Sequence, residues 1–219
     1  MNNEQRVKKR IYDYRDDAGT VLFRKIRYAP KTFIQERPDG QGGWIANREG
    51  VSLVVYRLPE LLGQKAILWC EGEKDVEAAW ALGIPATCGP DGAGPWKPCY
   101  GQQLVAQGVQ RVAVIPDNDA PGRAHGEAVA AGLQRVGIDV RVVTLPDLPD
   151  HGDLTDYLSA GHGKDDLIAL IKNTPIWARS DPVHIEIERP PRVFQALGEQ
   201  RYTLAIHPEG VTLEVNRLR

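Results

Sequence analysis

The sequence predicts a mixed α/β fold, in which a parallel β-sheet flanked by helices follows a β-rich segment and precedes a small β extension. Two continuous apolar runs, at 66–70 and 111–115, are typical of parallel strands buried on both faces. Helix-like segments alternate with these strands, as in right-handed crossovers. The predicted domains are a basic β-rich subdomain (1–62), an α/β domain (63–178) and a C-terminal β extension (179–219), which we interpret as a linker to a further domain.

The first 62 residues are expected to form a series of antiparallel strands. Strands at 11–15 and 20–28 flank the turn sequence Asp-Asp-Ala-Gly and predict a hairpin. A third strand at 31–37 ends at Pro-Asp-Gly, another turn sequence. A further strand is predicted at 51–56, and the short helix predicted at 58–62 has a proline in its first turn.

The region from 63 to 178 alternates between strands and helices. Two of its helices are expected to end at glycines, Gly83 and Gly137. The expected elements are strands at 66–70, 84–88, 111–115 and 140–144, and helices at 73–82, 99–107, 122–136, 154–160 and 165–172.

The C-terminal segment returns to strand patterns. Residues 183–188 alternate between polar and apolar, and 202–207 and 211–215 flank Pro-Glu-Gly, which predicts a hairpin. Because the chain stops directly after this hairpin, we expect a fragment or a processed part of a longer protein.

The composition is that of a globular protein, with 42% hydrophobic and 26% charged residues. No run approaches the roughly 18 apolar residues of a membrane span, and the first residues contain no apolar signal core, so we expect a cytoplasmic protein with no membrane partner. Cys70, Cys88 and Cys99 have no Cys-x-x-Cys spacing, so we expect no zinc in this chain.

The net charge of −2 hides an asymmetry along the chain. Residues 1–57 carry 12 Lys/Arg and 7 Asp/Glu, or +5, and residues 58–219 carry 15 and 22, or −7. A basic section beside an acidic one is typical of a protein that binds a polyanion and also holds a metal, although scattered surface charges would give the same count. Aromatic residues interleave with cations in the first section, a pattern that predicts single-stranded nucleic acid binding or, equally, a half-buried sheet with a basic outer face. The candidate DNA contacts there are Arg24, Lys25, Arg27 and Lys31.

Acidic residues follow both apolar strands. Glu71 comes directly after the first strand, and Asp117 and Asp119 follow the second, two residues apart, so that an extended chain would place both on one side. The carboxyl ends of parallel strands share one edge of the sheet, so these groups are expected to converge. Carboxylates held together repel one another unless a proton or cation lies between them, and Mg²⁺ is the hard, oxygen-liganded cation that phosphate chemistry uses.

Each acidic group also has a simpler interpretation. The sequence around Asp117 and Asp119 is a good turn with an aspartate helix cap, and acidic residues at 73 and 77 are favoured by the helix dipole. Asp153 would serve as an ordinary N-cap for the helix at 154–160.

The combination of motifs is more specific. Strand–Glu-Gly-x-x-Asp–helix, then strand–Asp-x-Asp-x-x-Gly–helix, then Gly-Asp-x-x-Asp-Tyr-Leu resembles the Toprim domain over about 64–160. The residues within these motifs are most similar to those of DNA primases and of primase–helicases of phages and mobile elements. The resemblance implies a nucleotidyltransferase that makes short primers on a single-stranded DNA template from NTPs, with Mg²⁺ or Mn²⁺ as cofactor, beside a replicative helicase or a missing helicase domain.

The resemblance also assigns roles by position. It makes Glu71 either a metal ligand or a general acid/base, and it implies that the metal helps a 3′-hydroxyl attack the α-phosphate of a bound triphosphate. Lys74 and Arg123 would then be phosphate contacts, although solvated surface positions are equally compatible with the sequence. The implied metal ligands are Glu71, Asp75, Asp117, Asp119 and Asp153.

Two departures leave other functions open. The cysteines of a primase zinc module are absent, and so is the Gly-x-x-x-x-Gly-Lys-[Ser/Thr] loop of a helicase motor. A Toprim nuclease or nicking enzyme would use the same site, and a non-catalytic DNA-binding module of a larger replication protein would not need it. A topoisomerase needs a separate tyrosine-bearing domain, and an aspartate phosphatase would have threonine where this chain has Pro121.

Overall fold

The computed structural model describes residues 7–30, 32–178, 183–186, 201–207 and 210–216. The chain forms two compact units, Met1–Trp177 and Ala178–Arg219. The first unit contains the N-terminal sheet and the parallel sheet together, and the predicted boundary at residue 62 stays a prediction.

The parallel sheet has four strands in the order β6-β5-β7-β8. The strands are β5 (Ala66–Cys70), β6 (Ala86–Thr87), β7 (Arg111–Ile115) and β8 (Asp139–Val142). Four residues of β5 and four of β7 are buried, as their continuous apolar sequences predict. Cys70 pairs with Ile115, so the two strands end side by side and the residues that follow them enter the same space. The predicted fold class is confirmed.

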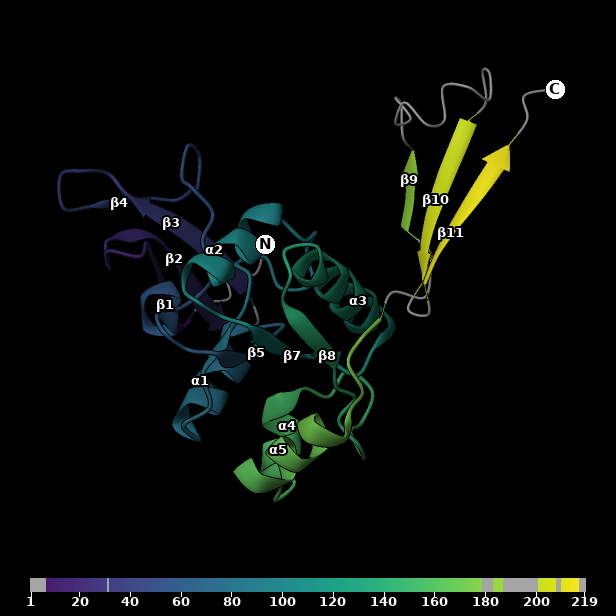
Figure 1. Ribbon diagram of the computed structural model, residues 1–219. Helices are drawn as coiled ribbons and strands as arrows, with labels where there is room; N and C mark the ends of the chain where they lie inside the picture. The colour runs from purple at the N-terminus through teal and green to yellow at the C-terminus, as the bar shows by residue number, and fades with distance from the viewer. Residues whose placement is uncertain (1–6, 31, 179–182, 187–200, 208–209, 217–219) are drawn as a thin grey trace, which may run out of the picture. The chain divides into compact units, whose positions relative to one another are not determined.

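In the described residues, five α-helices flank this sheet. Figure 1 shows α2 and α3 on one side of it and α1, α4 and α5 on the other. α3 begins two residues earlier than predicted because Asp119 caps it, accepting a hydrogen bond of 2.6 Å from the Gly122 amide. The helices are α1 (Glu73–Ala81), α2 (Pro98–Ala106), α3 (Ala120–Gln134), α4 (Leu154–Ser159) and α5 (Lys164–Asn173).

The N-terminal sheet is antiparallel, in the order β1-β2-β3-β4. The predicted hairpin is confirmed as β1 (Val7–Arg15) and β2 (Val21–Ala29), followed by β3 (Thr32–Pro38). A two-residue strand, β4 (Trp44–Ile45), pairs with β3 and was not predicted.

The predicted strand at 51–56 is wrong. This apolar segment is irregular, although Val55 and Tyr56 are buried. Its amides bond outside any strand ladder, Val55 to the Gln103 side chain at 3.0 Å and Tyr56 to the Cys88 carbonyl at 2.9 Å. The next turn is a 3₁₀ helix, Leu58–Leu61, with proline in its first turn as predicted.

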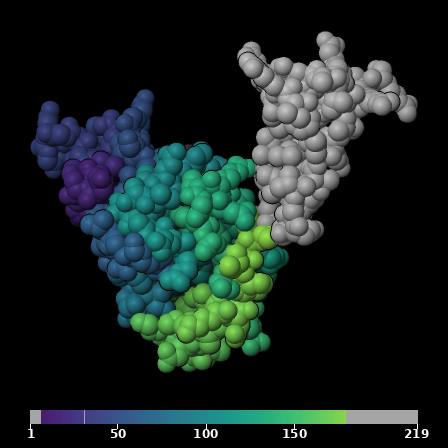
Figure 2. All heavy atoms as spheres, viewed as in Figure 1, coloured from purple at the N-terminus to yellow at the C-terminus, as the bar shows by residue number. Residues whose placement is uncertain are grey.

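One hydrophobic core joins the two sheets of the first unit. Tyr12, Tyr14 and Phe23 from the N-terminal sheet belong to the same buried cluster as Trp69 and Val76 of the α/β part. Tyr14 stacks on Phe23 with ring centroids 4.5 Å apart. Figure 2 shows the N-terminal strands lying directly against the central body. Because Tyr14 is fully buried, it offers no stacking surface for bases.

The second unit contains a three-stranded sheet in the order β11-β10-β9. Its strands are β9 (Val183–Glu186), β10 (Arg201–His207) and β11 (Gly210–Asn216). β10 and β11 form the predicted antiparallel pair, and the last two residues of the strand predicted at 183–188 lie outside the described residues. In the described part of the chain, none of the helices is long and apolar enough to cross a membrane.

Candidate functional site

A pocket of about 220 Å³ lies where the N-terminal sheet meets the carboxyl edge of the parallel sheet. One wall consists of side chains from β1, β2 and β3. The other comes from the turns after β5 and β7, from the loop after β6, from α1 and from the start of α4. The lining residues are Tyr12, Lys25, Arg27, Phe33, Glu71, Gly72, Glu73, Lys74, Asp75, Gly92, Asp117 and Asp153.

Asp117 shows the electrostatic character of this pocket. Burial raises the pKa of this carboxyl, and the neighbouring charges of Glu71, Asp75, Asp153 and Asp119 raise it further, to about 7. A carboxyl with such a pKa is half-protonated at neutral pH and takes a cation readily, because a cation removes the repulsion that the proton otherwise relieves. Glu71 and Asp117, which follow the two strands, line the same pocket.

Asp75 lies in the first turn of α1 and is held by α4. Its Oδ1 accepts hydrogen bonds from the Thr155 amide at 3.0 Å and from the Thr155 hydroxyl at 2.6 Å. Burial raises the pKa of Asp75, against the effect of these hydrogen bonds. Thr155 was not singled out in the sequence, because its partner is 80 residues away.

Asp153 is both a helix cap and part of the pocket. Its side chain accepts the Asp156 amide at 3.0 Å in a capping box at the start of α4, so the cap interpretation is correct. Its Oδ2 also forms an ion pair with Lys74. Burial acts to raise the pKa of Asp153, but the hydrogen bonds from Lys74 and from the Asp156 amide hold it below its ordinary value.

Asp119 is not among the residues that line the pocket. Its Oδ1 caps α3, and its Oδ2 lies 2.7 Å from Nδ1 of His151. The Gly122 amide first and the His151 side chain second lower the pKa of Asp119. The turn-and-cap interpretation describes its contacts, and Asp119 acts on the pocket through its charge on Asp117. His151 was missed because nothing in its own sequence context marks it.

Of the predicted DNA contacts in the N-terminal sheet, one is engaged in an ion pair, one lines the pocket and one is not described by the structure. Arg24 forms an ion pair of 2.6 Å with Glu36, and its guanidinium lies 3.7 Å from the centre of the Trp44 ring. Arg27 lines the pocket. Lys31 lies outside the described residues.

Of two further predicted contacts, Lys25 is buried and Arg123 is exposed. Lys25 is only 7% exposed and forms an ion pair with Glu73 at 2.9 Å. Arg123 is exposed on α3, and its Nη1 lies 3.5 Å from Asn118 Oδ1.

A second pocket, of about 320 Å³, adjoins the acidic one and is basic. The two share Tyr12, Arg27 and Lys74. Among the described residues no Asp or Glu lines this second pocket. Its lining consists of Lys9, Arg10, Tyr12, Arg27, Tyr28, Ala29 and Lys74. Lys9 and Arg10 were missed, although their place in a basic strand was the available signal.

The donors of the acidic pocket fit a hard divalent cation. Its carboxylate oxygens are the ligands that Mg²⁺ and Mn²⁺ prefer, and no cysteine is among the described residues that line it. In the described part of the chain no three His, Cys, Asp or Glu side chains are grouped closely enough to hold a metal ion. Mg²⁺ usually binds through one or two carboxylates plus substrate phosphates, so this partial set is compatible with it.

Comparison with known proteins identifies the fold. No protein-family model and no curated protein matches the chain. Among solved structures, the chain is similar to the primase fragment of the bacteriophage T7 primase–helicase protein, with 20% identity and a TM-score of 0.52 over 74% of this chain and 61% of that one. It is also similar to the zinc-binding and RNA polymerase domains of the Aquifex aeolicus primase, with 16% identity and a TM-score of 0.57 over 76% of this chain and 40% of that one.

The chain thus has a primase-type fold. It spans 61% and 40% of the length of the two structures it matches. At these identities the likeness describes the fold, and the chemistry must be argued from the pocket itself.

Proposed function

We propose that this chain is the core of a Toprim-type, primase-like nucleotidyltransferase that makes short primers on single-stranded DNA from NTPs. The observation that supports the proposal is the convergence of Glu71, Asp75, Asp117 and Asp153 on one pocket. There burial, together with the neighbouring carboxylates, raises the pKa of Asp117 to about 7. The order of these acidic residues along the chain is that of the Toprim motifs, and the fold is of the primase type.

Glu71 and Asp117, directly beyond β5 and β7, would hold the Mg²⁺ or Mn²⁺, with Asp75 and Asp153 beside them. When bound, such an ion neutralises the triphosphate and favours attack of a 3′-hydroxyl on the α-phosphate. With its pKa raised to about 7, Asp117 would give up its proton near neutral pH when it binds the cation. Thr155 fixes the orientation of Asp75 through two hydrogen bonds to one oxygen.

The adjoining basic pocket supplies the contact with nucleic acid. Lys9, Arg10, Arg27 and Lys74 place four cations around one hollow that opens beside the acidic pocket. Such cations neutralise phosphates without reading sequence. A DNA strand bound there passes the carboxylates, and Lys74 at the junction reaches either a phosphate or Asp153.

The proposed partners follow from the same fold. The T7 protein that this chain resembles is a primase–helicase. We infer that a replicative helicase, as a separate chain or as a further domain, works with this core.

The test is template-dependent primer synthesis with NTPs and either Mg²⁺ or Mn²⁺. We expect the full chain to incorporate ribonucleotides and both Glu71→Gln and Asp117→Asn to lose that activity. Asp139→Asn is the matched control, because Asp139 is exposed at the opposite end of the same sheet. Robust synthesis by Asp117→Asn would refute the proposal.

Two further arms separate the alternatives. Cleavage of DNA with Mn²⁺ and no nucleotides, without primer synthesis, would favour a nuclease that uses the same carboxylates. Tight binding of single-stranded DNA that does not respond to metal, with neither reaction, would favour a non-catalytic module.

A further inference from the structure

We propose that Glu73 is a positioning residue, which with Tyr14 and Lys25 fixes the Glu71–Gly72 turn against the N-terminal sheet. The inference rests on the proposed function, because Glu71 borders the pocket to which that function is assigned. It gives Glu73 a different role from the other acidic residues that line this pocket.

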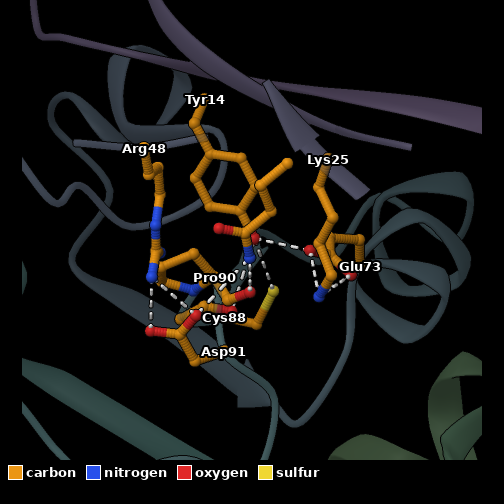
Figure 3. Close-up of polar contacts among 9 residues, drawn as sticks. Tyr14, Lys25, Arg48, Glu73, Cys88, Pro90 and Asp91 are labelled. Carbon is orange, nitrogen blue, oxygen red and sulfur yellow. Dashed lines mark hydrogen bonds and ion pairs between the residues drawn. The ribbon is translucent and has the colours of Figure 1, made fainter. Parts of the chain in front are cut away.

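The contacts of Glu73 are short and buried. The Tyr14 hydroxyl donates to Glu73 Oε1 at 2.6 Å, and Lys25 Nζ lies 2.9 Å from Oε1 and 3.1 Å from Oε2. Tyr14, Glu73 and Lys25 are 0%, 3% and 7% exposed. Figure 3 shows Tyr14 and Lys25 reaching from the N-terminal strands toward Glu73. One carboxylate therefore binds both β1 and β2.

These contacts of Glu73 affect the pocket because Glu73 lies close to Glu71 in the chain. Glu73 is the first residue of α1 and Gly72 is its N-cap, so the tied side chain lies only two residues beyond Glu71. Gly72 has an extended backbone, and its carbonyl accepts the Val76 amide at 3.2 Å. The contacts of Glu73 consequently limit how far the turn can move relative to the N-terminal sheet.

A second set of contacts joins the N-terminal sheet, and the loop that follows β4, to the loop after β6. Gln35 donates to the Pro90 carbonyl at 3.2 Å, and Arg48 lies 3.0 Å from Asp91 Oδ1. The next residue, Gly92, lines the acidic pocket. Figure 3 shows Arg48 reaching Asp91 on the far side of Tyr14 from Glu73. The N-terminal sheet thus contacts two segments that border the pocket.

Charge distinguishes a positioning role from direct metal binding. Both oxygens of Glu73 already lie within 3.1 Å of an ammonium group, so the pair contributes no net charge to the pocket. Removing one member of a buried pair leaves an uncompensated charge, which is far costlier than removing both. If Glu73 were a metal ligand instead, Lys25 would compete with the metal for it.

The experiment compares Glu73→Gln, Lys25→Met and the double variant in the full chain. Mn²⁺ affinity is measured by calorimetry without nucleotide or DNA, and backbone hydrogen exchange of residues 70–76 is measured without metal. Glu77→Gln is the matched control. Glu77 lies one turn further along α1 and also accepts from a tyrosine and a cation, Tyr56 at 3.1 Å and Arg57 at 2.9 Å, but it does not line the pocket.

We expect Glu73→Gln and Lys25→Met each to weaken Mn²⁺ binding by about 10-fold or more, as loss of a partner that orients a ligand does. Exchange at 70–76 should rise in both and stay unchanged in Glu77→Gln. The double variant should bind Mn²⁺ better than Lys25→Met alone, because no buried carboxylate is left uncompensated.

Tighter Mn²⁺ binding by Lys25→Met would overturn the inference, because it would mean that the freed Glu73 joins the metal. Unchanged exchange at 70–76 in Glu73→Gln would overturn it as well. If these results hold while the wild type makes no primer, the positioning role stands and the proposed polymerising function fails.

Discussion

Replacement of Asp117 by asparagine should stabilise the protein in a pH-dependent way. The pKa of Asp117 is about 7 in the folded protein against an ordinary value of 3.8, because of burial and four neighbouring carboxylates. Well below pH 4 the group is protonated whether the chain is folded or not. Between the two pKa values the unfolded chain releases the proton and the folded chain keeps it, so folding stability falls as the pH rises from about 4 through 7 and then levels off. Asparagine, which is neutral throughout, avoids this loss.

The size of the effect follows from the two pKa values. A difference of about 3 corresponds to roughly 4 kcal/mol for a fully enclosed group. Asp117 is only half-buried, and water screens its charge, so we expect about 1–2 kcal/mol for Asp117→Asn at pH 8. In a chain of this size that is a rise in melting temperature of about 2–8 °C. Near pH 4 the difference should approach zero.

The assay is urea unfolding of wild type and Asp117→Asn at several pH values, followed by tryptophan fluorescence, since Trp69 is 1% exposed in the core. Mg²⁺ should narrow the gap at pH 8, because an ion bound to the folded wild type relieves the same repulsion. A stability difference that is the same at pH 4.5 and pH 8 would refute the reasoning. It would mean that the carboxylates around Asp117 do not interact as their positions imply.

Two further predictions concern the surroundings of the pocket. Thr155→Val should lower the free energy of unfolding by about 1–3 kcal/mol in urea melts at neutral pH, because it removes the hydroxyl that donates to the buried Asp75 carboxyl. Ser159→Ala, which removes only an exposed bond within α4, should change it by less than about 0.5 kcal/mol, and equal losses in both would contradict this account. Arg27→Gln should weaken binding of single-stranded DNA in fluorescence anisotropy and reduce the slope of log affinity against log salt by about one. Arg135→Gln, on an exposed position, should leave that slope unchanged, and an unchanged slope in Arg27→Gln would place the DNA elsewhere.

The α/β part of the fold could be predicted because its signals are local. Strands β5 and β7 are continuous apolar runs, and the glycines after α1 and α3 have positive φ angles, 69° at Gly83 and 80° at Gly137. The strand predicted at 51–56 was wrong because the structure of this segment depends on distant residues. It is apolar because it is buried, but whether its amides join a ladder or meet Gln103 depends on a helix 48 residues away.

The site could be predicted only as far as position along a strand determines it. That Glu71 and Asp117 converge follows from parallel strands ending together. That Lys25 is buried does not follow, because a lysine in an exposed-looking strand enters the interior only if a distant carboxylate accepts it. The partner of Lys25, Glu73, is 48 residues away. The sequence around Glu73 indicates only an acidic residue favoured by the helix dipole.

The uneven distribution of charge along the chain is reorganised by the fold. Of the cations in the first section, Lys25 is neutralised by Glu73 and Arg24 by Glu36. The basic pocket instead combines Lys9, Arg10 and Arg27 of the first section with Lys74, which comes from the acidic section. Opposite charges therefore lie side by side in two joined hollows, although they are far apart in the sequence. A bound polyanion needs that arrangement, since cations hold its phosphates only if the adjacent carboxylates are themselves neutralised by a metal ion or a proton.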